Sequence, residues 1–356
     1  MSEPRPTYAV TEWHGCYDDS WNGVLVPDAF AHPAKFARGL IRRIYQHMLD
    51  SGYIAAGDSV VDPFGGVGLG GLDAMTFGLH YTGCELEDRF VTLGNQNIDK
   101  WRRDLAMLAD RLGTARLLQG DSRQLLAVVG AGAAAAVSSP PFGDQLPSHD
   151  DFQPPHDSTA RLGVNYETAY GNSPGQLGTM PPGDYAAAVS SPPYGGDALG
   201  HDAGCIRLDA NEDARRAAEG SYRRPGYGAT NDNIGNVTGD TFWAAARQIV
   251  GQTYAALRPG GYAAWVTKRF IRKGQIVEFS DQWEALCEAV GFEPVERIAA
   301  LLVEDHGDQL DIFGGMTTRR KERKSFFRRL AEKKGSPRID HEDVIIMRRP
   351  LFRSAP

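Results

Sequence analysis

Residues 58–137 alternate short apolar runs with segments of helical periodicity, and this alternation constrains the fold more than any other feature. The apolar runs are VVDPF, YTGCEL, ARLLQGD and AAAAVSS, and the helical segments between them are LGGLDAMTF, RFVTLGNQNIDKWRRDLAML and SRQLLAVV. Strands that alternate with helices form βαβ units, which build parallel sheets. We therefore expect an α/β fold with a doubly wound, mainly parallel sheet.

The first unit, DSVVDPFGGVGLGG at residues 58–71, places a glycine-rich turn between strand and helix. Glycine tolerates positive φ and lets a ligand approach the backbone closely. The spacing is not that of a dinucleotide fingerprint, and the Lys-Ser/Thr of a P-loop is missing. The next strand ends at Glu85, about twenty residues past the glycines, where an α/β nucleoside site keeps an acid for ribose hydroxyls. A third strand ends in Asp121. An ordinary strand-to-helix turn with solvated acids is the alternative.

The chain also contains one motif twice, AAAVSSPPFG at residues 134–143 and AAAVSSPPYG at residues 186–195. Two consecutive prolines stiffen the main chain and leave carbonyl oxygens as acceptors. The serine hydroxyl adds another acceptor, and the aromatic ring offers a flat face. These groups together suit an exocyclic amino group on a nucleobase that stacks on the ring. A proline-rich strand end without chemistry is the alternative.

At these motifs the chain resembles a known family. DPFGGVG is similar to the S-adenosyl-L-methionine (AdoMet) motif of class I methyltransferases, and SPPF and SPPY are similar to the catalytic motif of DNA amino-methyltransferases. The segment HPAKF at residues 32–36 resembles the family segment that contacts the methionine end of AdoMet. The resemblance covers roughly residues 30–305. It implies a Rossmann-like class I methyltransferase fold with long inserted loops.

The resemblance also implies an activity, methyl transfer from AdoMet to an exocyclic amino group of a flipped base in double-stranded DNA, with cytosine N4 preferred. Adenine N6, an RNA amino group and a non-catalytic AdoMet- or DNA-binding module stay open as alternatives. Glu85 would accept from the ribose hydroxyls and Asp121 from the adenine amino group. No metal is required. The candidate cofactor-binding residues are His32, Lys35, Asp62, Phe64, Gly65, Gly66, Gly68, Glu85 and Asp121. The candidate catalytic residues are Ser139, Pro140, Pro141, Phe142, Ser191, Pro192, Pro193 and Tyr194.

Only one copy of the repeated motif can occupy the strand beside the glycine turn. Ser139 lies one short helix after Asp121, which slightly favours the first copy. Ser191 leads directly into the segments that complete the sheet, so both copies stay open. The polar stretches 143–183 and 195–240 resemble each other in part and are the best candidates for target recognition.

The sequence suggests five segments. They are an N-terminal arm (1–30), the AdoMet-binding half (31–142), a duplicated insertion (143–240), the remainder of the catalytic sheet (241–316) and a basic C-terminal segment (317–356). Helices are expected at 33–52 and from 241 to the glycine pair at 260–261. A basic run such as that at 319–329 is usually a solvated helix face, and in a DNA enzyme the alternative is phosphate binding. The basic residues are Arg319, Arg320, Lys321, Arg323, Lys324, Arg328 and Arg329.

The overall charge and the cysteines narrow the class of protein. The formal net charge is -7, so only a local face of the molecule can be basic enough to bind nucleic acid. The 4 cysteines are widely separated, which disfavours a zinc site and favours a reduced compartment. With no signal peptide and no apolar run of transmembrane length, we expect a soluble, cytoplasmic protein. DNA is the expected partner, and a restriction endonuclease is compatible with the resemblance; oligomeric state is left open.

Overall fold

The computed structural model describes residues 11–32, 36–140, 242–272, 275–310, 316–322, 335 and 337–351. Its centre is an 8-stranded sheet in the order β1-β9-β12-β6-β5-β2-β3-β4. The strands are β1 (Thr11–Trp13), β2 (Ser59–Asp62), β3 (His80–Glu85), β4 (Ala115–Gln119), β5 (Ala133–Ser138), β6 (Leu257–Thr267), β9 (Glu293–Leu301) and β12 (His341–Arg348). Every neighbouring pair is parallel except those of β12, which runs antiparallel to β6 and β9.

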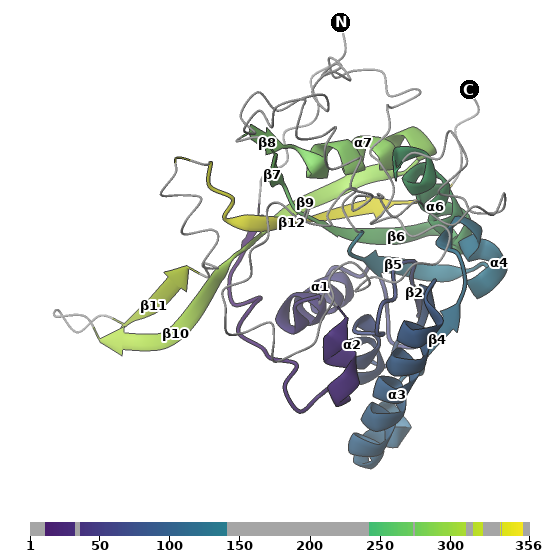
Figure 1. Ribbon diagram of the computed structural model, residues 1–356, viewed down its shortest axis with the longest axis horizontal. Coiled ribbons are helices and arrows are strands. Elements are labelled where there is room, and N and C mark those ends of the chain that lie inside the picture. Colours follow the sequence, from purple (N-terminus) through teal and green to yellow (C-terminus); the bar gives the residue numbers. More distant parts are fainter. Residues whose placement is uncertain are drawn as a thin grey trace, which may run out of the picture.

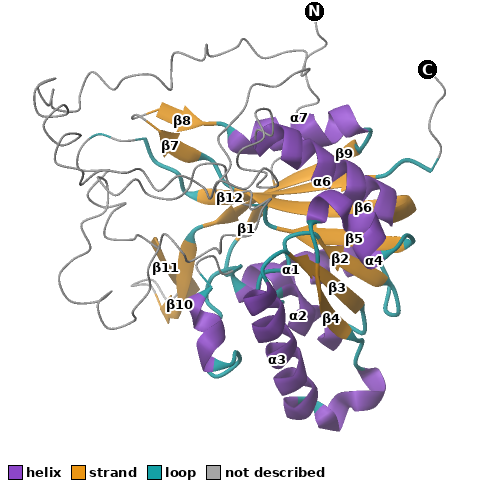
Figure 2. Cartoon of the chain, turned by 45° about the vertical axis from the view of Figure 1, so that its right-hand side comes forward, coloured by secondary structure: helices purple, strands orange, loops and turns teal. Residues whose placement is uncertain are grey.

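Helices cover both faces of this sheet (Figures 1 and 2). One face carries α1 (Arg38–Asp50), α2 (Gly70–Thr76) and α3 (Asp88–Asp104), and the other carries α4 (Leu125–Val129), α6 (Phe242–Ala256) and α7 (Phe279–Val290). Short 3-10 turns lie at Pro27–Ala31 (η1), Ala106–Arg111 (η2) and Ser122–Gln124 (η3). This arrangement confirms the expected α/β fold class, a Rossmann-like, mainly parallel sheet with helices on both sides.

The apolar runs of the sequence arise because helices cover both faces of the sheet. Side chains alternate along a strand, so Val60 packs among α1, α2 and α3 while its neighbour Val61 packs among α6 and α7. A strand covered on both faces has no polar side, which explains the continuous AAAAV of β5, all of it buried. The alanines of β5 also give the helices close access to the sheet.

The N-terminal segment is part of this core. β1 pairs in parallel with β9 at the edge of the sheet, and Trp13, Tyr17 and Trp21 are buried against α1. The Trp21 indole donates to the carbonyl of Phe36 at 2.8 Å. The segment expected as an extended arm therefore contributes large apolar side chains to the fold.

Two helices differ from their expected bounds. The helix expected at 33–52 begins only at Arg38, because the backbone is still extended at Ala37, and it ends at Asp50. The helix expected to reach residues 260–261 ends at Ala256, and β6 begins at Leu257. Leu257 already pairs with Ala133 of β5. The chain therefore forms the β5–β6 ladder at residues where the helix was expected to continue.

The C-terminal segment also differs from its expected form. The strands β10 (Val303–Leu310) and β11 (Met316–Glu322) form an antiparallel arm that extends from the body of the molecule (Figure 1). The described part of the basic run thus lies in a strand and not in a helix. A second hairpin joins β7 (Phe270–Arg272) to β8 (Gln275–Val277). β12 comes from the same C-terminal segment and lies inside the main sheet.

A network of buried charges fixes β12 between its neighbours. Asp343 accepts from the Arg297 Nε at 2.9 Å and from the Ser280 hydroxyl at 2.6 Å, and Ser280 in turn accepts from Thr267 at 2.9 Å. Burial alone raises the pKa of Asp343, but hydrogen bonds from His341, Arg297 and Ser280 outweigh it and hold the pKa below its ordinary value. The network ties β6, β9, β12 and the start of α7 together.

We expect Arg297→Ala to destabilise the protein by about 3–5 kcal/mol, because it leaves the Asp343 carboxylate buried without its charged partner. A depressed pKa adds stability above the ordinary carboxyl pKa of about 4, and this stability is lost as the pH falls below it. Chemical denaturation at neutral and acidic pH should therefore show a smaller acid sensitivity in the variant.

The control for this experiment is Arg258→Ala. Arg258 pairs with Asp58 at 3.0 Å, but its side chain is 48% exposed, so its loss should cost less than about 1 kcal/mol. Equal losses in the two variants would contradict a special role for the buried network.

Candidate functional site

The candidate site lies where the strand order reverses. From β2 the chain proceeds outward through β3 to β4, and it then returns to the other side of β2 with β5. In open α/β sheets ligands bind beyond the carboxyl ends of the strands at such a switch point. β2 ends at Asp62, β3 at Glu85 and β5 at Ser138. The glycine turn and the first Ser-Pro-Pro motif therefore leave the sheet side by side.

The glycine turn is held by β3. Gly65 donates its N–H to the Cys84 carbonyl, and Gly66 donates to the Glu85 Oε2, both at 2.9 Å. Gly66 and Gly68 adopt φ angles of +52° and +75°, which side chains disfavour. The turn thus has a fixed shape, set by main-chain and carboxylate contacts with the neighbouring strand.

The Glu85 carboxylate, beside the glycine turn, retains hydrogen-bond acceptor sites that a ligand could use. Its two oxygens accept only main-chain N–H groups among the contacts that the structure gives it, from Gly66 and from Glu87, each at 2.9 Å. Burial raises the pKa of Glu85 to about 7, against the lowering effect of those two hydrogen bonds. A carboxylate oxygen has two lone pairs, so each oxygen retains one for a hydroxyl donor.

His32 lies directly against the glycine turn. A Cβ placed on Gly66 would be 3.2 Å from the Cε1 and Nε2 atoms of the His32 ring. The ring also packs edge-on against Phe90 of α3, with 4.4 Å between centroids. The structure therefore brings His32 to the predicted site, while Lys35 lies outside the described residues.

Asp62 has a different environment. It is buried, and its carboxylate accepts from the Ser138 hydroxyl at 2.5 Å, the Phe64 N–H at 2.9 Å and the Tyr81 hydroxyl at 3.0 Å. Burial raises the pKa of Asp62, and the same three hydrogen bonds oppose that rise. Protein donors therefore occupy most of this carboxylate, which braces the turn from within.

Asp121 is engaged as well. Its oxygens accept from the Arg123 main-chain N–H and Nε and from the Arg123 Nη2 at 2.6 Å. Three N–H groups of Arg123 thus share the two carboxylate oxygens, and the contact of Asp121 with the adenine amino group stays a prediction. The next residue, Ser122, donates to the Pro63 carbonyl and ties this loop to the glycine turn.

Phe64 serves packing. The sequence left open whether its ring packs the turn or edges the cofactor. The half-buried ring packs against the core formed by α6 and α7, on the face of the sheet away from α2. The structure therefore favours the packing alternative.

The first copy of the repeated motif lies beside β2. β2 has only two neighbours in the sheet, β3 and β5, and β5 carries the first copy. Ser139 is exposed and Pro140 is buried just beyond the strand end. Pro141 and Phe142 lie outside the described residues, as do Ser191, Pro192, Pro193, Tyr194 and the stretches 143–183 and 195–240.

Sequence reasoning missed several residues that shape this site. Ser138 and Tyr81 hold Asp62, and Arg123 holds Asp121. The double serine in both copies of the motif was a signal for Ser138, since the repeat preserves SSPP and not only SPP. No feature of the sequence alone indicates that the Tyr81 hydroxyl donates to Asp62.

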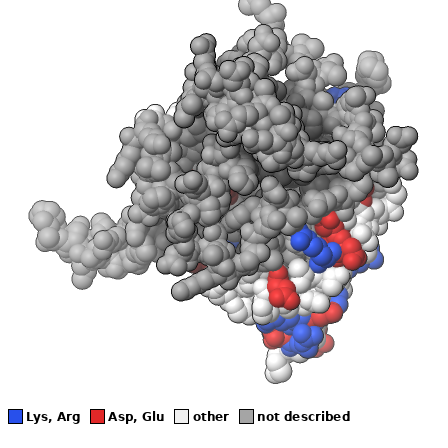
Figure 3. Space-filling model, in the orientation of Figure 1, with Lys and Arg blue, Asp and Glu red and all other residues white. Residues whose placement is uncertain are grey.

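The basic run enters the arm along β11. In the backbone register of β10 and β11, position 304 pairs with 321 and position 305 with 320, and a β-bulge interrupts the ladder before position 308. Residues 323–334 of the basic run lie outside the described residues. Acidic and basic side chains are also intermixed on the described part of the face shown in Figure 3.

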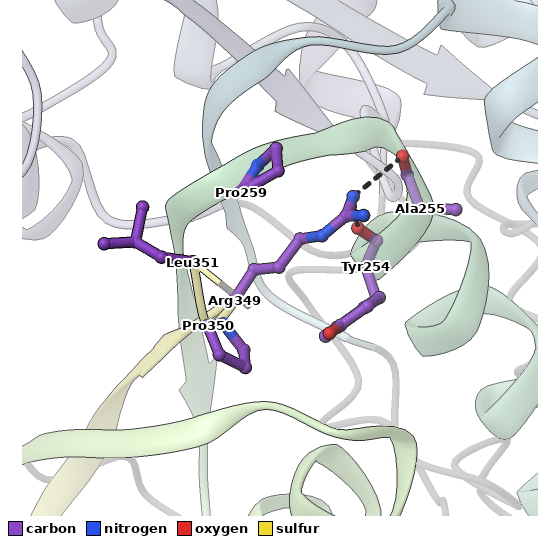
Figure 4. Close-up of a pocket in the computed structure, with 6 residues that line it drawn as sticks. All are labelled: Tyr254, Ala255, Pro259, Arg349, Pro350 and Leu351. Carbon is purple, nitrogen blue, oxygen red and sulfur yellow. Dashed lines mark hydrogen bonds between the residues drawn. The ribbon is translucent and has the colours of Figure 1, made fainter. Parts of the chain in front are cut away.

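A pocket of about 440 Å³ opens at the other end of the sheet, lined by Tyr254, Ala255, Pro259, Arg349, Pro350 and Leu351 (Figure 4). Arg349 points from the end of β12 to the last turn of α6 and donates to the carbonyls of Tyr254 and Ala255 at 2.8 and 3.2 Å. A cation at a helix C-terminus satisfies carbonyls that lack helical partners. The pocket therefore lies where Arg349 caps the C-terminus of α6. It is at the opposite end of the sheet from the carboxyl ends of the parallel strands.

Metal and membrane features give no further site. Cys16, Cys84 and Cys287 are buried free thiols, and no cluster of His, Cys, Asp or Glu suited to a metal ion occurs among the described residues. In the same part of the chain, no helix has both the length and the apolar character needed to span a bilayer.

No family model and no curated protein matches the chain. Solved structures do match its fold. A putative RNA methyltransferase from Pyrococcus horikoshii is 10% identical, with 91% of each chain covered and a TM-score of 0.40. A methyltransferase from Pyrococcus furiosus is 9% identical, with 86% of this chain and 82% of that chain covered and a TM-score of 0.36. A SAM-dependent methyltransferase from Methanosarcina mazei is 10% identical, with 85% and 98% covered and a TM-score of 0.37.

Proposed function

We propose that the protein is an AdoMet-dependent methyltransferase that modifies an exocyclic amino group of a DNA base, with cytosine N4 as the preferred acceptor. The observation that carries the proposal is the meeting of two motifs at one switch point. The glycine turn after β2 and the Ser139–Pro140 strand end after β5 leave adjacent strands. A cofactor at the first and a base at the second would be neighbours.

The residues present fit AdoMet at the glycine turn. Glu85 retains acceptor capacity for ribose hydroxyls, and its two existing partners hold it at the rim of the turn. His32 lies against Gly66, where the family segment that it resembles contacts the methionine end. Asp62 supports the turn through protein contacts, so we assign it a positioning role and not a direct cofactor contact. Asp121 would accept from the adenine amino group beside its contacts with Arg123. When bound, AdoMet supplies an electrophilic methyl group.

The acceptor motif supplies positioning for the amino nitrogen. An exocyclic amino group is a weak nucleophile because its lone pair is delocalised into the ring. Hydrogen bonds from its protons to the Ser139 hydroxyl and the Pro140 carbonyl would favour a pyramidal nitrogen with a localised lone pair. A fixed donor–acceptor geometry of this kind accelerates transfer without a metal or a covalent enzyme intermediate. The nitrogen's spare proton leaves to solvent after transfer.

Serine ahead of the proline pair favours cytosine N4 over adenine N6 in the family that the motif resembles. In the duplex neither amino group is accessible for in-line transfer, so the base must leave the stack, and Phe142 supplies a stacking face by the same resemblance. The second motif, with Ser191 and Tyr194, would then serve the target-binding stretches and not transfer, because both places beside β2 are taken by other strands.

We expect AdoMet binding to depend on ionised Glu85. Since its pKa is about 7, the free protein should bind AdoMet more weakly as the pH falls from about 8 to about 6, when the carboxylate becomes protonated. Glu85→Ala should weaken binding by about 10- to 100-fold at the higher pH, as for loss of hydrogen bonds to a charged group. Calorimetric titration with AdoMet measures both effects.

Two controls accompany this titration. Glu85→Gln should bind weakly at every pH and lose the pH dependence. Asp88→Asn removes an exposed carboxylate at the start of α3 and should keep both the affinity and its pH dependence. A pH dependence that persists in Glu85→Gln would remove Glu85 from the cofactor site.

We expect N4-methylcytosine in DNA from cells that express the protein, measured by mass spectrometry of nucleoside digests. Ser139→Ala should abolish the modified base while the purified variant still binds AdoMet. Digests that contain only N6-methyladenine would overturn the choice of base but keep the enzyme class. Absence of any methylated nucleoside, in DNA or RNA, with AdoMet binding intact would instead support a non-catalytic binding module.

For the basic run we expect contacts with DNA phosphates, as the charges in the sequence predict for a DNA enzyme. Replacing Arg319, Arg320 and Lys321 together with alanine should weaken binding to all DNA sequences about equally and reduce the slope of log affinity against log salt by about 3. A variant with unaltered affinity and salt slope would show that these three residues do not contact phosphates.

A further inference from the structure

The buried carboxylate of Asp62 joins the strand that carries the acceptor motif to the turn that would bind AdoMet. Its Oδ1 atom accepts from the Ser138 hydroxyl at 2.5 Å and from the Phe64 N–H of the turn at 2.9 Å. The same oxygen thus contacts the last residue of β5 and the start of the glycine turn. Ser138 is fully buried and Asp62 is 5% exposed, so water cannot replace either partner.

The Ser138–Asp62 contact lies just past the last residue pair of the ladder between β2 and β5. The ladder between β2 and β5 consists of Val60 opposite Ala135 and Val61 opposite Ala136. On its other side, β5 remains paired with β6 as far as Ser138 opposite Trp265. Past that last pair, the side chains of Ser138 and Asp62 form a buried hydrogen bond between β5 and β2, and the next residues along the chain are Ser139 and Pro140.

Tyr81 holds the same carboxylate from the opposite side. Its hydroxyl donates to the Asp62 Oδ2 at 3.0 Å from β3, and its ring packs where Cβ atoms of Gly70 and Gly71 would lie. Tyr81 therefore supports the turn and α2, but it has no part in the link to β5. The two donors make separable contributions to one carboxylate.

The geometry points to Ser138 as a positioning residue that, through Asp62, sets the Ser139–Pro140 acceptor strand against the glycine turn. This inference rests on the proposed function. Ser138 touches neither base nor cofactor; its contribution is the relative placement of the two motifs. A misplacement of the order of an ångström between reacting groups costs about a hundredfold in rate, so a contact at this point should govern transfer more than binding.

The test compares Ser138→Ala with Thr253→Val. Thr253 is also fully buried, and its hydroxyl donates to the Ile249 carbonyl at 2.8 Å within α6, outside the contacts of Asp62 and of the glycine turn. We expect Ser138→Ala to lower kcat by at least about tenfold and to keep the AdoMet dissociation constant within about threefold. Thr253→Val should lower thermal stability to a similar extent but keep kcat within about threefold. Hydrogen exchange of the peptide covering residues 136–139 should accelerate in Ser138→Ala and not in Thr253→Val.

Several outcomes overturn the inference while the proposed function stands. They are a kcat in Ser138→Ala close to that of the wild type, equal kcat losses in the two variants, or a loss of AdoMet affinity with kcat unchanged at saturation. If Ser138→Ala does not fold, Ser138→Cys keeps the side-chain volume with a weaker donor, and wild-type kcat in that variant overturns the inference. Absence of methyl transfer by the wild-type protein contradicts the proposed function itself and is detected before any variant is made.

Discussion

A carboxylate that is removed from water must be surrounded by donors, and the candidate site is arranged around one such group. Asp62 ends the central strand β2 and takes its donors from β5, from β3 and from the glycine turn. Any change in the spacing of these three elements would leave the buried Asp62 carboxylate without hydrogen-bond donors. This would reduce the free energy of unfolding by several kcal/mol. The requirement to satisfy one side chain thus limits how far the elements that form the site can move relative to each other.

A second buried carboxylate performs a comparable task in the other half of the sheet. Asp343 lies on the antiparallel strand β12, which joins the sheet between β6 and β9 after the chain has already built both. Its contacts with Arg297 and Ser280 fix β12 in place. They thereby stabilise the antiparallel strand within an otherwise parallel sheet. The two carboxylates differ in their partners. Asp343 has a cation and a depressed pKa, while Asp62 has only neutral donors and a raised pKa.

Elements that have a periodic pattern in their own sequence could be predicted. Elements whose position depends on contacts with residues far along the chain could not. Periodicity predicted the strands and helices between residues 58 and 137, because each is a local pattern with its own turn signals. The burial of the N-terminal segment, the place of β12 and the early end of α6 all depend on partners far along the chain. The same distinction holds at the site. Spacing predicted that Glu85 would lie beside the glycine turn, as it does, whereas the contacts of Asp121 with Arg123 depend on a rotamer that no spacing specifies.

If the proposed function holds, the duplicated motif raises the question of why one copy would be catalytic and its near-identical repeat would not. A strand in a sheet has two neighbours, and for β2 these are β3 and β5. The first copy therefore excludes the second from the only position in which a Ser-Pro-Pro end can lie beside the glycine turn. The first serine of this copy, Ser138, also donates to the Asp62 carboxylate. The repeat retains a serine pair, at residues 190–191, but the chain offers one Asp62 and one switch point. Under the proposed function, topology would thus separate the roles of two copies with the same residues, with transfer at the first copy and substrate recognition at the second.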